Sequence, residues 1–271
     1  MKSKKSENHN SKDSSKAPSI GRGLGKVDLN CDIGEGIGSD ESIMPYISSA
    51  NIACGYHAGD ENTIWETMEL AKKYKVSVGA HPSFLDKENF GRKEMDLSPG
   101  DVYELVEQQL ILFDEIASDA EVSMQHVKPH GALYNMSAKN TSIAKAIANA
   151  VKDYNAQLVL FGLSGSHSIR EAKAIGLKTA SEVFADRTYQ DDGSLTPRLQ
   201  PNALIEDADK AIQQVLQMIK KGTVTTLSGK IIPIVAETIC IHGDGKHAAA
   251  FAKQIHEALM NEGVKILPVN K

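Results

Sequence analysis

Histidines, carboxylates and a lysine stand at the C-terminal ends of short apolar segments along the chain. KVDLNCDI ends next to Asp32, ANIACGYH ends in His57, VSVGAH ends in His81, and MQHVKPH carries Lys128 and His130. Carboxylates and imidazoles act as general bases or acids, and an ammonium group can stabilise a developing oxyanion. The repeated position of these groups after apolar segments predicts one shared catalytic cavity.

Alternation within the first segment indicates which side chains face that cavity. Successive side chains of a strand point to opposite faces, so Asp28, Asn30 and Asp32 share one face and Leu29 and Cys31 the other. The polar face either meets water or looks into a catalytic cavity. We favour the cavity because polar residues recur in the same phase on later segments, and buried polar groups need partners or a ligand.

This interpretation makes Asp32 the candidate general base and Asn30 a candidate substrate contact. The alternative for Asp32 is a buried carboxylate that accepts hydrogen bonds from backbone amides.

Apolar segments alternate with amphipathic helical patterns along the rest of the chain. The expected strands cover residues 26–33, 49–55, 76–81, 124–130, 157–162, 178–185, 232–242 and 264–269. The expected helices cover residues 61–74, 98–117, 140–154 and 203–221. This alternation predicts parallel strands joined by helical crossovers. Polar groups follow seven of the strands, which favours a closed (β/α) barrel, where all strand ends meet at one mouth, over an open doubly wound sheet.

Length and composition limit the class of protein. The chain has 271 residues, and we expect residues 1–25, which are rich in Ser and Lys, to be a disordered extension rather than a targeting peptide, and residues 26–271 to form a single barrel domain. A formal net charge of -5 argues against nucleic-acid binding, and no apolar run is long enough to span a membrane. The three cysteines form no CxxC pair, which favours a reducing compartment and a cytoplasmic location.

Two later segments add candidate substrate contacts. DRTYQDDGSLTPR begins at Asp186 and is long, charged and glycine-containing, so it is typical of a lid in which Arg187 or Arg198 binds a carboxylate. A solvated surface loop is the alternative. HGDGKH follows an expected strand and contributes His242 and Asp244 to the same mouth.

Lys128 and His130 share a face, so one could transfer a proton while the other stabilises an oxyanion or phosphate. A structural ion pair is the open alternative for Lys128. We expect His81 to be catalytic and His57 to contact substrate.

Three residues are expected to pack rather than react. Cys31 and Cys54 fall in the opposite phase from the polar residues of their strands, so they belong under the helices. Trp65 lies in a helical apolar stripe, which predicts a position in the core.

Six ordered blocks carry a family resemblance: VDLNCDIGEGIG, ANIACGYHAGD, GAHPSF with FGR, VKPHGALYN, EVFADRTYQDDGSLTPR and ICIHGD. From about Val27 to its end, the chain resembles the LamB/YcsF family. The resemblance implies a distorted TIM-like (β/α) barrel related to glycoside hydrolases and polysaccharide deacetylases. It also implies opening of the lactam 5-oxoproline to L-glutamate, with ATP used together with other 5-oxoprolinase subunits.

Polysaccharide deacetylases bind a metal through one aspartate and two histidines, and Asp32, His57 and His81 superficially resemble that triad. Their HxxxH spacing is missing here, because Leu85 stands four residues after His81. We therefore predict no bound metal.

ATP binding also has no recognised motif in this chain. A phosphate-binding GxxxxGK[ST] loop would need glycine at the positions that Ile20, Val224 and Cys240 occupy before the three Gly-Lys pairs. An unstrained lactam resists hydrolysis, so we expect partner subunits to supply the ATP chemistry.

Three functions stay open on the sequence. The first is an ATP-dependent 5-oxoprolinase subunit, and the second is a stand-alone metal-dependent deacetylase or amidohydrolase that acts on a sugar or another lactam. The third is a non-catalytic subunit that binds an acidic metabolite.

Overall fold

The computed structural model describes residues 25–242 and 248–270. The expected extension therefore lies outside the described residues apart from Gly25, and so does Asp244. The division into a disordered extension and a single domain stays a prediction. Among the described residues, no helix has both the length and the apolar character that crossing a bilayer requires.

A parallel β-barrel forms the centre of the described part of the chain, and seven strands close it. Each strand pairs with its neighbour in the order β1-β2-β3-β4-β5-β6-β9, and β9 pairs with β1 to complete the ring. The strands are β1 (Lys26–Ile33), β2 (Ser49–Ala53), β3 (Ser77–His81), β4 (Met124–Val127), β5 (Val159–Leu163), β6 (Lys178–Phe184) and β9 (Thr238–His242). The expected closed barrel is confirmed, and its C-terminal strand ends share one mouth.

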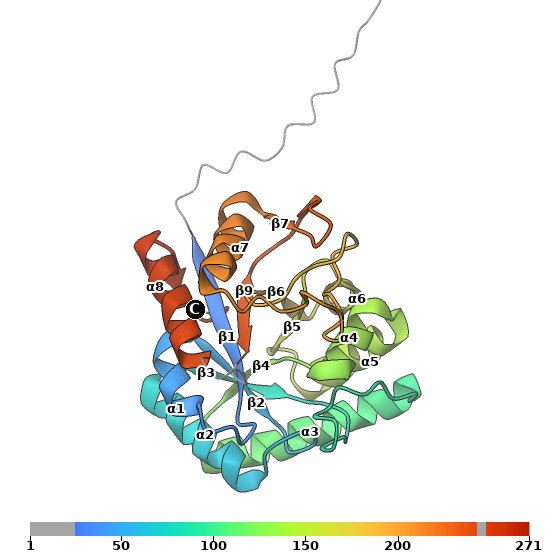
Figure 1. Ribbon diagram of the computed structural model, residues 1–271. Helices are drawn as coiled ribbons and strands as arrows, with labels where there is room; N and C mark the ends of the chain where they lie inside the picture. The colour runs from blue at the N-terminus through green and yellow to red at the C-terminus, as the bar shows by residue number, and fades with distance from the viewer. Residues whose placement is uncertain (1–24, 243–247, 271) are drawn as a thin grey trace, which may run out of the picture.

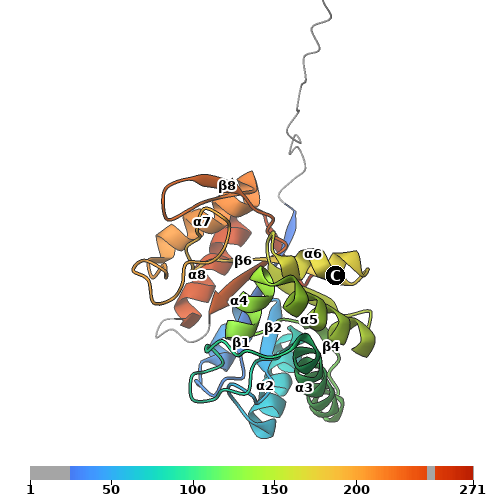
Figure 2. The same ribbon diagram turned by 90° about the vertical axis from the view of Figure 1, so that its right-hand side faces the viewer.

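Helices surround the strands (Figure 1). They are α1 (Asp40–Ile43), α2 (Glu61–Tyr74), α3 (Pro99–Asp119), α4 (Gly131–Lys139), α5 (Thr141–Tyr154), α6 (His167–Ala174), α7 (Ala208–Lys221) and α8 (Ala248–Asn261), with a short 3-10 turn at Met44–Tyr46. Helices α7 and α8 lie side by side on one flank (Figure 2). Apolar side chains between the helices and the outer face of the strands form the main core, which includes Cys31 and Cys54 as expected.

Local sequence signals explain several helix ends. Ser98 caps α3 in a capping box with Asp101. Asp60 caps α2 by accepting a hydrogen bond from the backbone N–H of Thr63. Asp207 caps α7 by accepting hydrogen bonds from the backbone N–H groups of Asp209 and Lys210. This helix therefore begins five residues later than the expected start at residue 203.

The expected strand over residues 232–242 is wrong in its first half. The structure divides it into β8 (Ile231–Pro233), which pairs antiparallel with β7 (Thr223–Thr225), and the barrel strand β9. Only Lys265–Ile266 of the expected last strand is extended, as β10, and it pairs with the start of β1 beside the ring. The irregular segment at 234–237 was concealed because its first three residues are apolar.

Trp65 is also placed wrongly by the sequence analysis. Its side chain is 45 % exposed on α2, whereas Ile64 and Met68 of the same helix are buried. The buried stripe of α2 therefore runs one residue away from Trp65, because residues i and i+4 share a helix face.

The barrel interior is polar near its mouth and closely packed. His126 of β4 stacks on Phe161 with ring centroids 4.3 Å apart, and its Nε2 donates a hydrogen bond to Asn51 Oδ1 at 2.8 Å. Gly79 of β3 pairs with both Asn51 and His126 in the sheet. A Cβ atom added to Gly79 would lie 2.2 Å from the Cδ2 and Nε2 atoms of His126. Glycine at this position therefore makes room for the imidazole.

We expect Gly79→Ala to destabilise the barrel by about 1–3 kcal/mol, because the methyl group forces His126 off its stacked position. Thermal unfolding followed by circular dichroism measures the change. Gly100→Ala is the matched control, since the nearest atom to its Cβ is Ser98 Oγ at 3.7 Å. Equal melting temperatures for the two variants would contradict the packing argument.

Candidate active site

A cavity of about 650 Å³ opens at the C-terminal ends of the barrel strands. Its walls come from barrel strands, from the loops that follow them and from the segment after β6. The lining includes the candidate residues Asp32, His81, Lys128, His130, Arg187, Arg198 and His242, together with Glu35. Seven of the candidate residues therefore line the cavity, whereas Glu35, Arg92, Lys93, Glu94 and Lys139 of the lining were not predicted.

Asp32 lies at the inner end of this cavity. Its Oδ1 accepts hydrogen bonds from Lys128 Nζ and Asn51 Nδ2, both at 2.8 Å, and its Oδ2 lies 3.4 Å from His81 Nε2. Burial by itself raises the pKa of this carboxyl, but His81 and the Lys128 ammonium outweigh burial and hold the pKa well below its usual range. Asp32 is therefore a carboxylate at neutral pH.

Lys128 is held between two carboxylates. The side chain is 2 % exposed, and Nζ lies 2.8 Å from Asp32 Oδ1 and 2.9 Å from Glu182 Oε1. Nζ also contacts Asn30 Oδ1 at 3.3 Å and Cys240 Sγ at 3.1 Å. Burial lowers the pKa of Lys128, but Asp32, Cys240 and Glu182 raise it well above its usual range, so the ammonium persists. Its three protons already have acceptors, which favours the ion-pair role over oxyanion binding.

Asn30 belongs to the support of the site and does not line the cavity in the described part of the chain. Its Nδ2 donates to Glu182 Oε1 at 3.0 Å and to Thr238 Oγ1 at 2.6 Å, while its Oδ1 accepts from Asn51. All of its polar atoms are thus used inside the barrel. Its expected substrate contact stays a prediction, and the contacts described here are those of a positioning residue.

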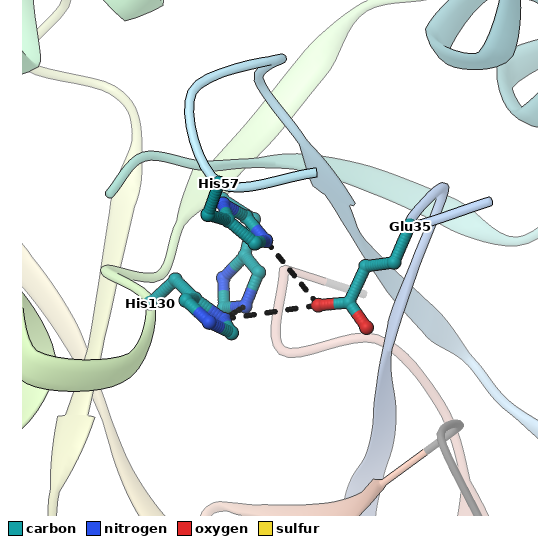
Figure 3. Close-up of side chains that lie close together, drawn as sticks. Glu35, His57 and His130 are labelled. Atoms are coloured by element: carbon teal, nitrogen blue, oxygen red, sulfur yellow. Dashed lines mark hydrogen bonds and ion pairs between the residues drawn. The ribbon is translucent and has the colours of Figure 1, made fainter. Parts of the chain in front are cut away.

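A cluster of three histidines and one glutamate occupies the side of the mouth above β1 to β4. His57 Nε2 lies 3.3 Å and His130 Nδ1 3.8 Å from Glu35 Oε1, and the Glu35 carboxylate points toward both rings (Figure 3). His81 Nε2 lies 2.9 Å from His130 Nδ1. The rings of His57 and His130 stack with centroids 3.8 Å apart. One possible ligand atom from each of these four residues lies within 4.8 Å of the others.

Each imidazole of this cluster is anchored through its outer nitrogen. His81 Nδ1 donates to Lys128 O at 2.6 Å, and His130 Nε2 donates to Phe90 O at 2.9 Å. His57 Nδ1 lies 2.9 Å from the hydroxyl oxygen of Ser83. Burial lowers the pKa of His57 to about 3 and that of His130 well below its usual range. His57 stacks on His130 and is not among the described residues that line the cavity, and its expected substrate contact stays a prediction.

The segment after β6 forms the opposite wall. His242 Nδ1 lies 2.9 Å from Asp186 Oδ1 and 2.8 Å from Oδ2, so the carboxylate fixes the ring. Asp186 is not part of the described cavity lining and orients His242 from behind. Burial raises the pKa of Asp186, but His242 together with Arg198 and Arg187 lowers it overall.

Arg187 and Arg198 bring positive charge to this wall. Arg187 is buried, and its Nη2 donates to Thr196 O at 2.6 Å. Burial and Arg198 lower the pKa of Arg187 to about 10, which leaves it cationic at neutral pH. Tyr189, two residues further on, is wholly buried, and its hydroxyl oxygen accepts from Phe184 N at 2.8 Å. The first part of the expected lid is thus anchored in the core, and closure of a lid stays a prediction.

The sequence analysis missed two carboxylates of the site. Glu35 follows β1 and reaches the histidine cluster from a turn between Gly34 and Gly36, both of which have positive φ. Glu182 lies on β6 and faces Lys128. Alternation on the expected strand 178–185 places Glu182 in phase with Ala180 and Phe184, but the opposite phase carries Thr179 and Ser181, so polarity did not mark one face as the inner one.

Comparison with known proteins agrees with this geometry. The LamB/YcsF family matches residues 27–271. A protein of Oceanobacillus iheyensis, named as the A subunit of 5-oxoprolinase, is 52% identical over 246 residues, which are 89% of this chain and 96% of that protein. A protein of Tolumonas auensis with the same name is 51% identical over 248 residues, covering 90% of this chain and 99% of its own length.

The crystal structure of the lactam utilization protein from Thermus thermophilus superposes with a TM-score of 0.83 at 40% identity, over 89% of this chain and 99% of that one. Matches of this extent cover the barrel and every strand end that lines the cavity. The chain therefore belongs to the LamB/YcsF family.

Proposed function

We propose that this chain is the A subunit of an ATP-dependent 5-oxoprolinase, which opens the lactam ring of 5-oxoproline to give L-glutamate. The observation that carries the proposal is the relative that bears this name and shares 52% of its residues over 96% of its own length. The name of the lactam utilization protein points to the same class of substrate.

The cavity suits a small anionic lactam. 5-Oxoproline carries one carboxylate beside a cyclic amide, and Arg187 and Arg198 line the cavity. A guanidinium group binds a carboxylate or a phosphate through paired hydrogen bonds. We assign these arginines to substrate binding, with the amide directed toward Asp32 on the opposite side.

Ring opening needs a base for water and an acid for the departing nitrogen. Asp32 is ionised and lies in the cavity, so in this scheme it accepts a proton from the water that adds to the amide carbon. A ring nitrogen of His242 lies within 4.8 Å of an Asp32 oxygen, and Asp186 orients the ring. His242 is our candidate donor of the proton that the ring nitrogen takes up when the carbon–nitrogen bond breaks.

ATP enters this scheme through partner subunits. The chain has no GxxxxGK[ST] loop, and hydrolysis of an unstrained lactam is slow. We infer that a partner transfers a phosphoryl group from ATP to the substrate, and that this chain carries out or assists the opening of the activated ring. A cytoplasmic location, where ATP and glutamate are available, belongs to the same proposal.

The direct test is reconstitution. The purified chain, candidate partner subunits, 5-oxoproline and ATP are mixed, and each component is omitted in turn while glutamate is measured. We expect glutamate only when all components are present. Ring opening by the chain alone would support the stand-alone amidohydrolase instead, and unaffected glutamate release when this chain is omitted would remove it from the reaction.

Asp32→Asn should lower partner-dependent turnover by ~10²–10⁴-fold, because an amide cannot accept the proton. We expect the fold to persist, because Lys128 keeps its contact with Glu182 at 2.9 Å and the buried pair stays neutral. Glutamate release and melting temperature are measured on the same preparation. A destabilised variant with full turnover would show that Asp32 only packs.

Lys128→Met should destabilise the barrel by about 3–5 kcal/mol, because it leaves Asp32 and Glu182 without their shared cation. Chemical denaturation measures the change. Replacing Glu182 by glutamine in the same chain should recover part of the stability, since one uncompensated charge is removed. A stable Lys128→Met protein with low turnover would favour direct contact of Lys128 with the substrate.

A further inference from the structure

When its three rings are neutral, the histidine cluster at the mouth has more hydrogen-bond acceptors than N–H groups to satisfy them. His81 Nδ1 and His130 Nε2 each donate their proton to a backbone carbonyl, of Lys128 and Phe90 respectively. A neutral imidazole carries only one N–H. Both inner nitrogens, His81 Nε2 and His130 Nδ1, are then unprotonated, yet they lie 2.9 Å apart. Two lone pairs at that distance require a cation or a proton beside them.

His57 adds a third lone pair. In the arrangement in which the Ser83 hydroxyl donates to Phe84 O at 2.9 Å, its oxygen accepts from His57 Nδ1, which lies 2.9 Å away. The inner nitrogen, His57 Nε2, is then also unprotonated, and it faces Glu35 Oε1 at 3.3 Å. Three imidazole nitrogens and one carboxylate oxygen thus converge.

We propose that Glu35, His57, His81 and His130 bind one divalent transition-metal ion of the zinc class. Neutral imidazole and carboxylate are ligands that such ions accept, and outer-nitrogen hydrogen bonds of the kind seen here fix metal-binding histidines in position. The inference uses only side-chain geometry and does not depend on which lactam the chain opens.

The spacing of the four atoms suits a four-coordinate ion. Tetrahedral zinc with bonds of about 2.0–2.1 Å holds its ligand atoms about 3.4 Å apart. The distances here are 2.9 Å between His81 and His130, 3.3 Å between His57 and Glu35, and 3.8 Å between His130 and Glu35. Small side-chain rotations bring such a set onto one ion.

The site is built by four neighbouring strands. Glu35 follows β1, His57 follows β2, His81 ends β3, and His130 follows β4. The HxxxH spacing, whose absence led us to predict no metal, places two ligands on one helix turn. Adjacent strand ends bring ligands together without any such spacing.

When bound, an ion of this kind supplies Lewis acidity next to Asp32, whose Oδ2 lies 3.4 Å from His81 Nε2.

A shared proton is the competing arrangement. A protonated His81 could donate from Nε2 to His130 Nδ1 and to Asp32 Oδ2, which would remove the clash of lone pairs without a metal. That arrangement predicts a protein that binds no zinc. Metal binding therefore separates the two.

The test measures metal on the full chain without substrate or partners. The protein is stripped with a chelator, dialysed and titrated with Zn²⁺ and with Co²⁺, and bound metal is counted by elemental analysis. We expect one ion per chain, a visible absorption band from four-coordinate Co²⁺, and a higher melting temperature with Zn²⁺. A failure of 5-oxoproline hydrolysis would not affect these readouts.

Glu35→Gln and His57→Asn should each weaken Zn²⁺ binding by at least ~100-fold, since loss of even an outer partner costs roughly 10–100-fold. His256→Asn is the matched control, because His256 contacts Tyr46 O away from the cluster. Circular dichroism checks that each variant is folded. Absence of bound metal in the wild-type chain, or retention of the metal by both folded variants, would overturn the proposal.

Discussion

The buried ammonium of Lys128 is the interaction on which the barrel interior depends. A charge inside a protein is tolerated only when paired groups replace its hydration. Asp32 from β1 and Glu182 from β6 provide that pairing, at 2.8 and 2.9 Å. His81 and the Lys128 ammonium together keep Asp32 ionised, and Lys128 also holds one of its oxygens in place. Stability of the barrel and readiness of the candidate base thus have one physical origin.

Around Lys128 and its two carboxylates, the hydrogen bonds of the barrel interior form a chain that runs from donor to acceptor in one direction. His126 donates to Asn51, and Asn51 donates both to Asn30 and to Asp32. Asn30 in turn donates to Glu182. Each amide is oriented by its neighbours, and the final acceptors of this chain of hydrogen bonds are the carboxylates of Asp32 and Glu182. A polar interior of this kind is rigid because rotation of one amide would break several bonds.

Side-chain alternation and the residue types at the strand ends made much of the candidate site predictable from the sequence. Asp32, Lys128, His81 and His130 follow apolar runs, and the cavity at the barrel mouth contains all four. Glu182 could not be placed the same way, because polar residues occur in both phases of its strand, and the contact of Glu182 with Lys128 shows which face is inside. The break between β8 and β9 inside the expected strand 232–242 was missed because Ile234, Val235 and Ala236 continue the apolar run up to Glu237.

The role of the histidines shows a further limit of spacing arguments. Sequence spacing detects ligands that share a helix turn or a tight loop, since those distances are set locally. Glu35 and His130 are nearly a hundred positions apart, and barrel closure alone brings Glu35 Oε1 within 3.8 Å of His130 Nδ1. What the sequence did contain was the residue type at each strand end. The directions of the His81 and His130 rings came from the backbone carbonyls of Lys128 and Phe90, whose positions no residue type reveals. In a parallel barrel, convergent side chains are therefore better sought among successive strand ends than within any one segment.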